Sequence, residues 1–177
     1  MATWYPLAKR ELVTDHSAPG TLEQRNLVVL HITMGPSDFG HDVAPSALNV
    51  IAGFRASVSP KRVSSHFVID RDGTVFQLMP LEDTAWHASE VNSRSVGVET
   101  AASADGKYPA TEAQYAAASA LVSWLCDLLK ISCDREHVRT HNEASPHDGH
   151  VNCCTAGLNP DKVVQPKAES SGSIEAV

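Results

Sequence analysis

The spacing of apolar residues along the chain predicts alternating strands and helices. Residues 27–32 form a continuous apolar run, rich in β-branched side chains, that ends shortly before Gly35 and Pro36. Such a run is typical of a buried central strand. Residues 111–130 place apolar side chains at helical intervals behind Thr111, a residue type that caps helices. We therefore expect a buried strand in the first segment and a long amphipathic helix in the second.

The chain between these two elements contains a predicted hairpin, a strand and a helix. Asp72 and Gly73 separate two apolar runs, 66–70 and 74–79, and an Asp-Gly pair favours a tight hairpin turn. Residues 95–100 form another short apolar run, which predicts a strand. Residues 45–57 are expected to be helical, with an apolar face made of Leu48, Val50, Ile51 and Phe54.

Strands that alternate with helices indicate an α/β fold: a single domain with a central mixed β-sheet flanked by helices. A chain of 177 residues is long enough to bury one hydrophobic core. We expect residues 1–26 to be an N-terminal extension packed on the domain and residues 27–167 to form the domain itself. Residues 168–177 contain almost no core-forming side chains and are expected to be a disordered tail or linker.

Charge and hydropathy exclude some classes of partner. The formal net charge is −7, which argues against nucleic acid as a partner because phosphate binding depends on Lys and Arg. The sequence has no apolar run long enough to cross a membrane. Residues 1–10 lack the basic stretch and apolar stretch of a secretory signal. We therefore expect no membrane insertion, no signal peptide, and synthesis in the cytoplasm.

The four cysteines do not make a disulfide framework in a chain of this length. Cys126 and Cys133 could pair with each other or remain as buried thiols. Cys153 and Cys154 are adjacent, which gives poor geometry for a disulfide between them. The cysteines therefore do not indicate whether the protein works in an oxidising or a reducing compartment. Nothing in the sequence indicates more than a monomer.

A cluster of histidines and cysteines near the C-terminus is the least ordinary feature of the chain. Imidazole and thiolate are preferred zinc ligands, and a catalytic zinc site needs only three protein ligands. His31, at the end of an apolar strand, could supply a ligand from a rigid element, although a strand histidine is more often a hydrogen-bonded core residue. The cluster itself comprises His137, His141, His147, His150, Cys153 and Cys154.

Several segments together resemble the type 2 N-acetylmuramoyl-L-alanine amidases. This family includes the phage lysozyme-type amidases and is related to the peptidoglycan recognition proteins. The resemblance covers roughly residues 27–165 and follows the order of the family's motifs. The segments that carry it are 28–33 (Val-Val-Leu-His-Ile-Thr), 63–75 with the hairpin, 85–88 (Ala-Trp-His-Ala), 92–99, and 139–143 (Arg-Thr-His-Asn-Glu).

The resemblance implies a zinc site with His31 and His141 as ligands. It implies Cys153 as the third ligand, with Cys154 nearly as suitable. The Pro-Gly that usually follows this ligand in the family is missing here, so the choice between the cysteines stays open. His147 and His150 are nearby alternatives.

The same resemblance implies roles for several other residues. Glu99 matches the catalytic glutamate, and Ser65 stands where some members of the family have a tyrosine instead. Trp86 and His87 are expected to shape the groove and bind substrate, and His66 is expected to be structural. The residue that stabilises the oxyanion stays unassigned.

The implied function is zinc-dependent hydrolysis of the amide bond between N-acetylmuramic acid and L-alanine in bacterial peptidoglycan. The protein would act on the cell wall, either as a phage endolysin released by a holin or as a bacterial wall amidase. An alternative is a recognition module that binds peptidoglycan without cutting it. A further alternative is a cysteine hydrolase that uses Cys153 or Cys154 with a histidine.

Overall fold

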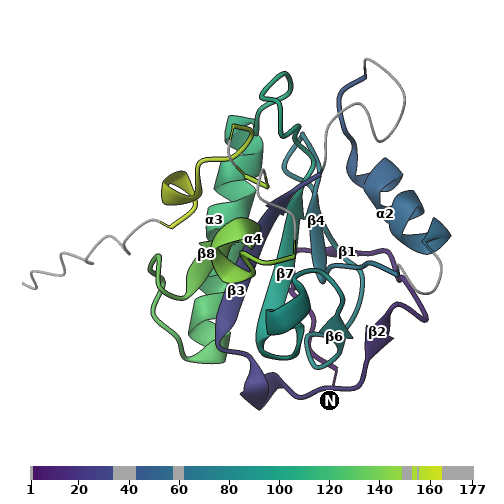
Figure 1. Cartoon of the computed structure of the whole chain (residues 1–177), viewed down its shortest axis with the longest axis vertical. Helices are drawn as coiled ribbons and strands as arrows, with labels where there is room; N and C mark the ends of the chain where they lie inside the picture. The colour runs from purple at the N-terminus through teal and green to yellow at the C-terminus, as the bar shows by residue number, and fades with distance from the viewer. Residues whose placement is uncertain (1, 34–42, 58–61, 149–152, 155, 165–177) are drawn as a thin grey trace, which may run out of the picture.

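The protein is built around one mixed sheet (Figure 1). The structure, a computed structural model, describes residues 2–33, 43–57, 62–148, 153–154 and 156–164. From edge to edge, the six-stranded sheet contains β1 (Lys9–Arg10), β5 (Val75–Gln77), β4 (Phe67–Ile69), β7 (Ser95–Thr100), β3 (Leu27–Ile32) and β8 (Val138–Thr140). β4 and β5 pair antiparallel, whereas the other neighbours in this sheet pair parallel. The expected α/β fold with a central mixed sheet is confirmed.

Two helices cover opposite faces of this sheet. α3 (Glu112–Leu129) packs over Phe67 and Ile69 of β4, whereas α2 (Ala47–Ala56) packs over Val68, which lies between them. Because side chains alternate along a strand, the two helices lie on different sides. Figure 1 shows them separated by the sheet.

β3 is the strand that brings candidate chemistry into the middle of the sheet. All of its residues are buried, and it pairs with β7 on one side and β8 on the other. Leu30 and Ile32 join the core beneath α3, whereas Val29 packs in a separate cluster. His31 shares the face of Val29 by alternation, so it lies on the side that α2 covers.

The predicted strands and the hairpin are confirmed. β3 and the strand predicted at 95–100 have the expected bounds. β4 and β5 form the hairpin, and Gly73 in its turn has a φ of 86°, a conformation that glycine adopts without strain. Local sequence patterns were therefore sufficient to predict these elements.

The helices follow the predictions with one correction. α3 begins after Thr111, whose hydroxyl accepts from the backbone of Gln114 in a complete capping box. α2 is present, but Leu48 was wrongly expected on its buried face, since it is 57% exposed. The buried residues Ala47, Val50 and Ile51 are spaced i, i+3 and i+4, which turns Leu48 toward solvent.

The polar, histidine-rich region held elements that we did not predict. It contains β8 and the short helix α4 (His141–Ala144), which are too short for periodicity to indicate. The N-terminal segment supplies β1 and also β2 (Ser17–Ala18), which pairs with β6 (Thr84–Ala85). The remaining elements are the 3-10 helices η1 (Leu22–Gln24), η2 (Ser89–Arg94) and η3 (Pro160–Lys162).

The domain boundaries stay predictions, and the tail at 168–177 lies outside the described residues. Cys126 and Cys133 are free thiols. Within the described part of the chain, the helices do not have the length and apolar character needed to cross a membrane.

Candidate functional site

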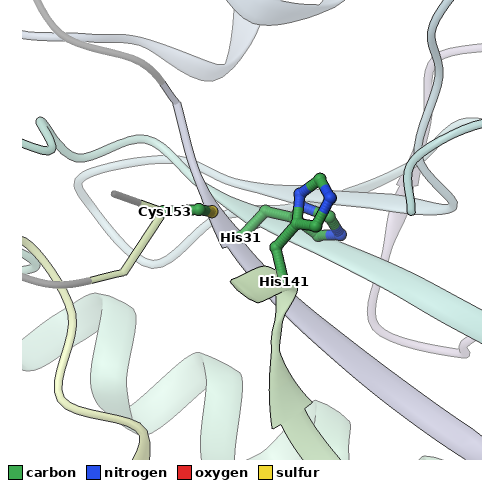
Figure 2. Close-up of side chains that lie close together, drawn as sticks. All are labelled: His31, His141 and Cys153. Atoms are coloured by element: carbon green, nitrogen blue, oxygen red, sulfur yellow. The ribbon is translucent and has the colours of Figure 1, made fainter. Parts of the chain in front are cut away.

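Three of the predicted metal ligands lie together near the carboxyl-terminal ends of β3 and β8 (Figure 2). β3 carries His31, and His141 directly follows β8, its parallel neighbour. The ligand atoms of His31, His141 and Cys153 all lie within 4.8 Å of one another, and all three residues are buried. Imidazole and thiolate suit zinc, and three protein ligands leave a coordination position for water or substrate. The donor set therefore fits a catalytic zinc ion.

The two adjacent cysteines differ in their surroundings. The Cys154 thiol donates to the carbonyl oxygen of Leu30 at 3.3 Å, and its backbone has a φ of 67°. Its sulfur lies 3.7 Å from that of Cys153. Contact with the Cys154 thiol, His141 and His31 lowers the pKa of Cys153 far below its ordinary range. Because metals bind the thiolate, Cys153 has the ionisation that a ligand needs.

The alternative histidine ligands do not join this group in the described structure. His147 is exposed, and His150 lies outside the described residues. His137 precedes β8 and is 2.8 Å from Asp134 through Nδ1. Of the two cysteines, the geometry favours Cys153 over Cys154.

His141 has a carboxylate partner, Asp148, that the sequence did not indicate. Its Nε2 is 2.5 Å from Oδ2 of Asp148. Burial lowers the pKa of His141, but hydrogen bonds with Cys153 and Asp148 outweigh it and leave that pKa raised. A carboxylate on the second ring nitrogen is the usual way to orient a metal-binding histidine. Asp148 therefore leaves Nδ1 of His141 for a metal ion.

Glu99 lies on β7 directly beside His31 on β3. Its Oε1 is 4.0 Å from Nδ1 of His31. Its Oε2 is buried and has no hydrogen-bond partner among the residues that the structure describes. Burial raises the pKa of Glu99 to about 7, although His31 opposes this shift. A carboxyl group with such a pKa can both accept and release a proton near neutral pH.

A cavity of about 290 Å³ lies over this group of residues. The metal-ligand candidates and Glu99 make up most of its polar lining, together with His87. α2 contributes apolar lining on the same face of the sheet. The apolar residues are Val50, Gly53 and Phe54 of α2, with Ile32, Val63 and Trp86.

The segment that carries Trp86 and His87 is fixed by long-range hydrogen bonds. The Trp86 N–H donates to Oγ of Ser64 at 2.9 Å, and the Ser64 N–H donates to the Trp86 carbonyl at 3.0 Å. The side chain of Asn92 accepts from the backbone N–H of His87 at 3.0 Å. Both predicted substrate-binding residues thus line the cavity on a braced segment, while their role stays a prediction.

Arg25 also holds the segment that carries Trp86 and His87, a role that nothing in the sequence indicated. It is 2% exposed, and its guanidinium donates to the backbone on both sides of Trp86. Its acceptors are the carbonyl oxygens of Leu81, Glu82, Asp83, Asn92 and Ser93 and the hydroxyl of Thr84.

His66 has the structural role that we expected. Its Nε2 donates to the carbonyl oxygen of Asp83 at 2.9 Å, and its Nδ1 accepts from the N–H of Gly97 at 3.1 Å. Burial lowers the pKa of His66 to about 3, so the ring is neutral at physiological pH.

Comparison with known protein families identifies the chain. Residues 22–154 match the family described as N-acetylmuramoyl-L-alanine amidase. The chain belongs to this family. It is also similar to the 1,6-anhydro-N-acetylmuramyl-L-alanine amidase AmpD of Escherichia coli, with 32% identity over 117 residues. That alignment covers 57% of this chain and 61% of the relative, less than two thirds of its length. The Citrobacter freundii AmpD is 29% identical over 69% of this chain and 72% of its own.

Solved structures of this fold are similar over most of the chain. A crystal structure of a selenomethionine AmpD derivative gives a TM-score of 0.68, with 21% identity, and the match covers 90% of this chain and 94% of that one. The N-acetylmuramoyl-L-alanine amidase endolysin LysCS from Clostridium intestinale gives a TM-score of 0.65 at 19% identity, covering 89% and 93%. At these identities the likeness concerns the fold.

Proposed function

We propose that the protein is a zinc-dependent amidase that cleaves the bond between N-acetylmuramic acid and L-alanine. The observation that carries the proposal is the convergence of His31, His141 and Cys153 next to Glu99 beneath a cavity. Membership of the N-acetylmuramoyl-L-alanine amidase family supports the same reaction.

In this proposal His31, His141 and Cys153 hold the zinc ion. A zinc ion with three protein ligands acts as a Lewis acid on a carbonyl and makes a water molecule acidic enough to react at neutral pH. Glu99 accepts the proton of the attacking water on its unpartnered Oε2 and delivers it to the leaving nitrogen of L-alanine. The pKa of about 7 that burial gives Glu99 matches a group that alternates between base and acid.

The cavity lining supports a substrate with both polar and apolar parts. Trp86 offers an aromatic surface for the sugar ring, and Phe54 and Val50 of α2 offer apolar surface for the lactyl and alanyl methyl groups. Aromatic and aliphatic side chains commonly line ligand sites while a few polar groups set orientation.

We propose bacterial peptidoglycan or its soluble fragments as the partner. The AmpD relatives are described as acting on 1,6-anhydro-N-acetylmuramyl-L-alanine, and one structural neighbour is described as an endolysin. The protein would be made in the cytoplasm and act as a monomer on cell-wall material, without nucleic acid or membrane insertion.

The test compares wild type, Glu99→Gln and Cys153→Ser on purified peptidoglycan and on a soluble muramyl peptide. We expect wild type to bind about one zinc ion and to release peptides with a new N-terminal L-alanine. A chelator should abolish this release, and added zinc should restore it. Binding to peptidoglycan without new amino termini would instead indicate a recognition module. Activity that survives the chelator but not a thiol reagent would indicate a cysteine hydrolase.

A further inference from the structure

His31 and His141 are oriented by different kinds of partner. Asp148 holds His141, whereas Nε2 of His31 is 2.9 Å from Nδ1 of a second histidine, His87. A hydrogen bond between two imidazoles requires one nitrogen to donate and the other to accept. The direction of this bond therefore decides which nitrogen of His31 carries its proton.

The contact of Nε2 of His87 with Ser95 settles the direction of the hydrogen bond between the two histidines. Oγ of Ser95 donates its proton to the carbonyl oxygen of Val91 at 2.7 Å. The same oxygen lies 3.2 Å from Nε2 of His87, so it can only accept there. Nε2 of His87 must therefore carry a proton.

The protonation of the other ring nitrogen of His87, Nδ1, follows from the charge of the ring. Its ring nitrogens face a hydroxyl and another imidazole, neither of which is an anion. A buried imidazole without a counter-charge is neutral because a bare buried charge is costly. Nδ1 of His87 is thus an acceptor, and Nε2 of His31 is the donor.

From this chain of contacts we infer that His87 and Ser95 form a positioning relay that fixes His31 in the tautomer with a free Nδ1 for the metal ion. That Nδ1 faces the site, 4.0 Å from the Glu99 carboxylate. The inference rests on the metal site of the proposed function. It assigns His87 a role through His31, in addition to its place in the cavity lining.

The surrounding backbone is shaped to hold the relay. Gly97 of β7 lies against the His87 ring, and a Cβ at this position would be 2.7 Å from Cγ of His87. The side chain of Asn92 fixes the backbone on the C-terminal side of the ring by accepting from the Ala88 N–H at 2.7 Å. The ring therefore has little freedom to turn over and exchange its two nitrogens.

A neutral relay has an electrostatic advantage at this ligand. The site already contains the Cys153 thiolate and the Glu99 carboxylate, and Asp148 contacts His141. A carboxylate on His31 would add another negative charge to a buried group. The histidine and serine orient His31 without adding charge.

The first test measures tautomers in the metal-free wild-type protein by long-range ¹H–¹⁵N NMR of the histidine rings. We expect protons on Nε2 of both His31 and His87. A proton on Nδ1 of His87, or the lack of one on Nε2 of either ring, would overturn the inference. This measurement needs no variant, so it does not depend on whether a substitution folds.

The second test measures the dissociation constant for Zn²⁺ by competition with a chelating dye. His87→Ala and Ser95→Ala should each weaken zinc binding by about 10- to 100-fold, as is usual for residues that orient ligands. His87→Asn should recover part of this loss because its Oδ1 can accept near the position of Nδ1. His137→Ala, a histidine outside the cavity, is the control and should bind zinc as wild type does.

The outcomes separate this inference from the proposed function. If wild type binds zinc and both alanine variants bind it equally well, the relay is wrong while the amidase proposal stands. If wild type binds no zinc, the proposed function fails, and the NMR tautomers still decide whether the relay exists.

Discussion

At the scale of single residues, the site combines groups whose ionisation is set by burial and by close neighbours. Burial raises the pKa of Glu99 to about 7, and contacts with Cys154, His141 and His31 lower the pKa of Cys153 far below its ordinary range. The pKa of Cys153 depends on its neighbour Cys154 and also on His31 and His141, which are distant in sequence. Substitutions at these two positions should therefore separate proton transfer from metal binding.

Glu99→Gln should retain zinc and lose activity. The amide has nearly the same shape as the carboxyl group but cannot accept the proton of water. Loss of a general base lowers rates by about 10²- to 10⁴-fold, which a peptide-release assay would measure. Zinc content at the wild-type level is the control, and wild-type activity in this variant would contradict the role of Glu99.

Cys153→Ser should lose zinc, whereas Cys154→Ser should keep it. The Cys153 sulfur lies with both histidines, but the Cys154 thiol donates to the carbonyl oxygen of Leu30, and a serine hydroxyl can also donate there. Metal analysis of dialysed protein distinguishes the two variants. The reverse result would make Cys154 the third ligand.

At the scale of elements, parallel pairing explains how distant ligands meet. β3 and β8 run parallel, so His31 and His141 lie side by side near the carboxyl-terminal ends of the two strands. α2 lines the cavity at these strand ends, where Gly53 lies beside Phe54. A Cβ at Gly53 would meet no atom within 4 Å, so this helix position has room for a methyl group.

Gly53→Ala should stabilise the protein. A glycine inside a helix costs about 0.5–1 kcal/mol relative to alanine, and here the added methyl group meets no neighbour. Urea denaturation should show this increase in the free energy of unfolding. Ala52→Gly, at the preceding exposed position of the same helix, is the matched control and should lower it by a similar amount. A loss of stability in Gly53→Ala would show that the space is not open.

The elements differ in how far the sequence predicted them. The hairpin, β3, β7 and α3 follow from local patterns, such as the Asp-Gly turn and the Thr111 cap. β8 and α4 are too short to carry a period, and β1 is set by its pairing with β5. The candidate ligands were found by resemblance rather than by spacing. Asp148, Arg25 and the His87–Ser95 contact were missed because they consist of tertiary contacts.

At the scale of the whole molecule, buried polar residues connect the cavity to the body of the fold. Arg25 joins the segments on either side of Trp86 through backbone carbonyl oxygens. His66 joins β7 to the carbonyl of Asp83. These contacts make the placement of the cavity lining depend on global folding.

Arg25→Ala should destabilise the fold and disturb the cavity. It leaves several buried carbonyl oxygens without a donor, at about 1–3 kcal/mol for each group that water cannot reach. We expect a loss of about 3 kcal/mol or more in urea denaturation. Arg94→Ala, which removes an exposed arginine bonded to Asn26, is the control and should change stability little. Equal effects would contradict the bracing role of Arg25.

The metal-free protein should lose stability in acid because of His66. Its folded pKa is about 3, below its ordinary value of 6.5, so the unfolded state binds the proton first. Stability is complete above pH 6.5 and falls as the pH drops toward 3, by up to about 1.4 kcal/mol per pH unit from this group. Urea denaturation at pH 7.5, 6 and 5 would measure the fall. An NMR titration of His66 near 6.5 in the folded protein would contradict it.

The central position of β3 has a consequence for the order in which the site comes apart. Its backbone is paired on both sides and its residues are all buried, so its amide hydrogens should exchange with solvent only through global unfolding. His31 is thus expected to lie in a slowly exchanging part of the molecule, whereas His141 begins a four-residue helix. If the site holds zinc as proposed, local fluctuations that release His141 would leave His31 in place to bind the metal ion again when the chain closes.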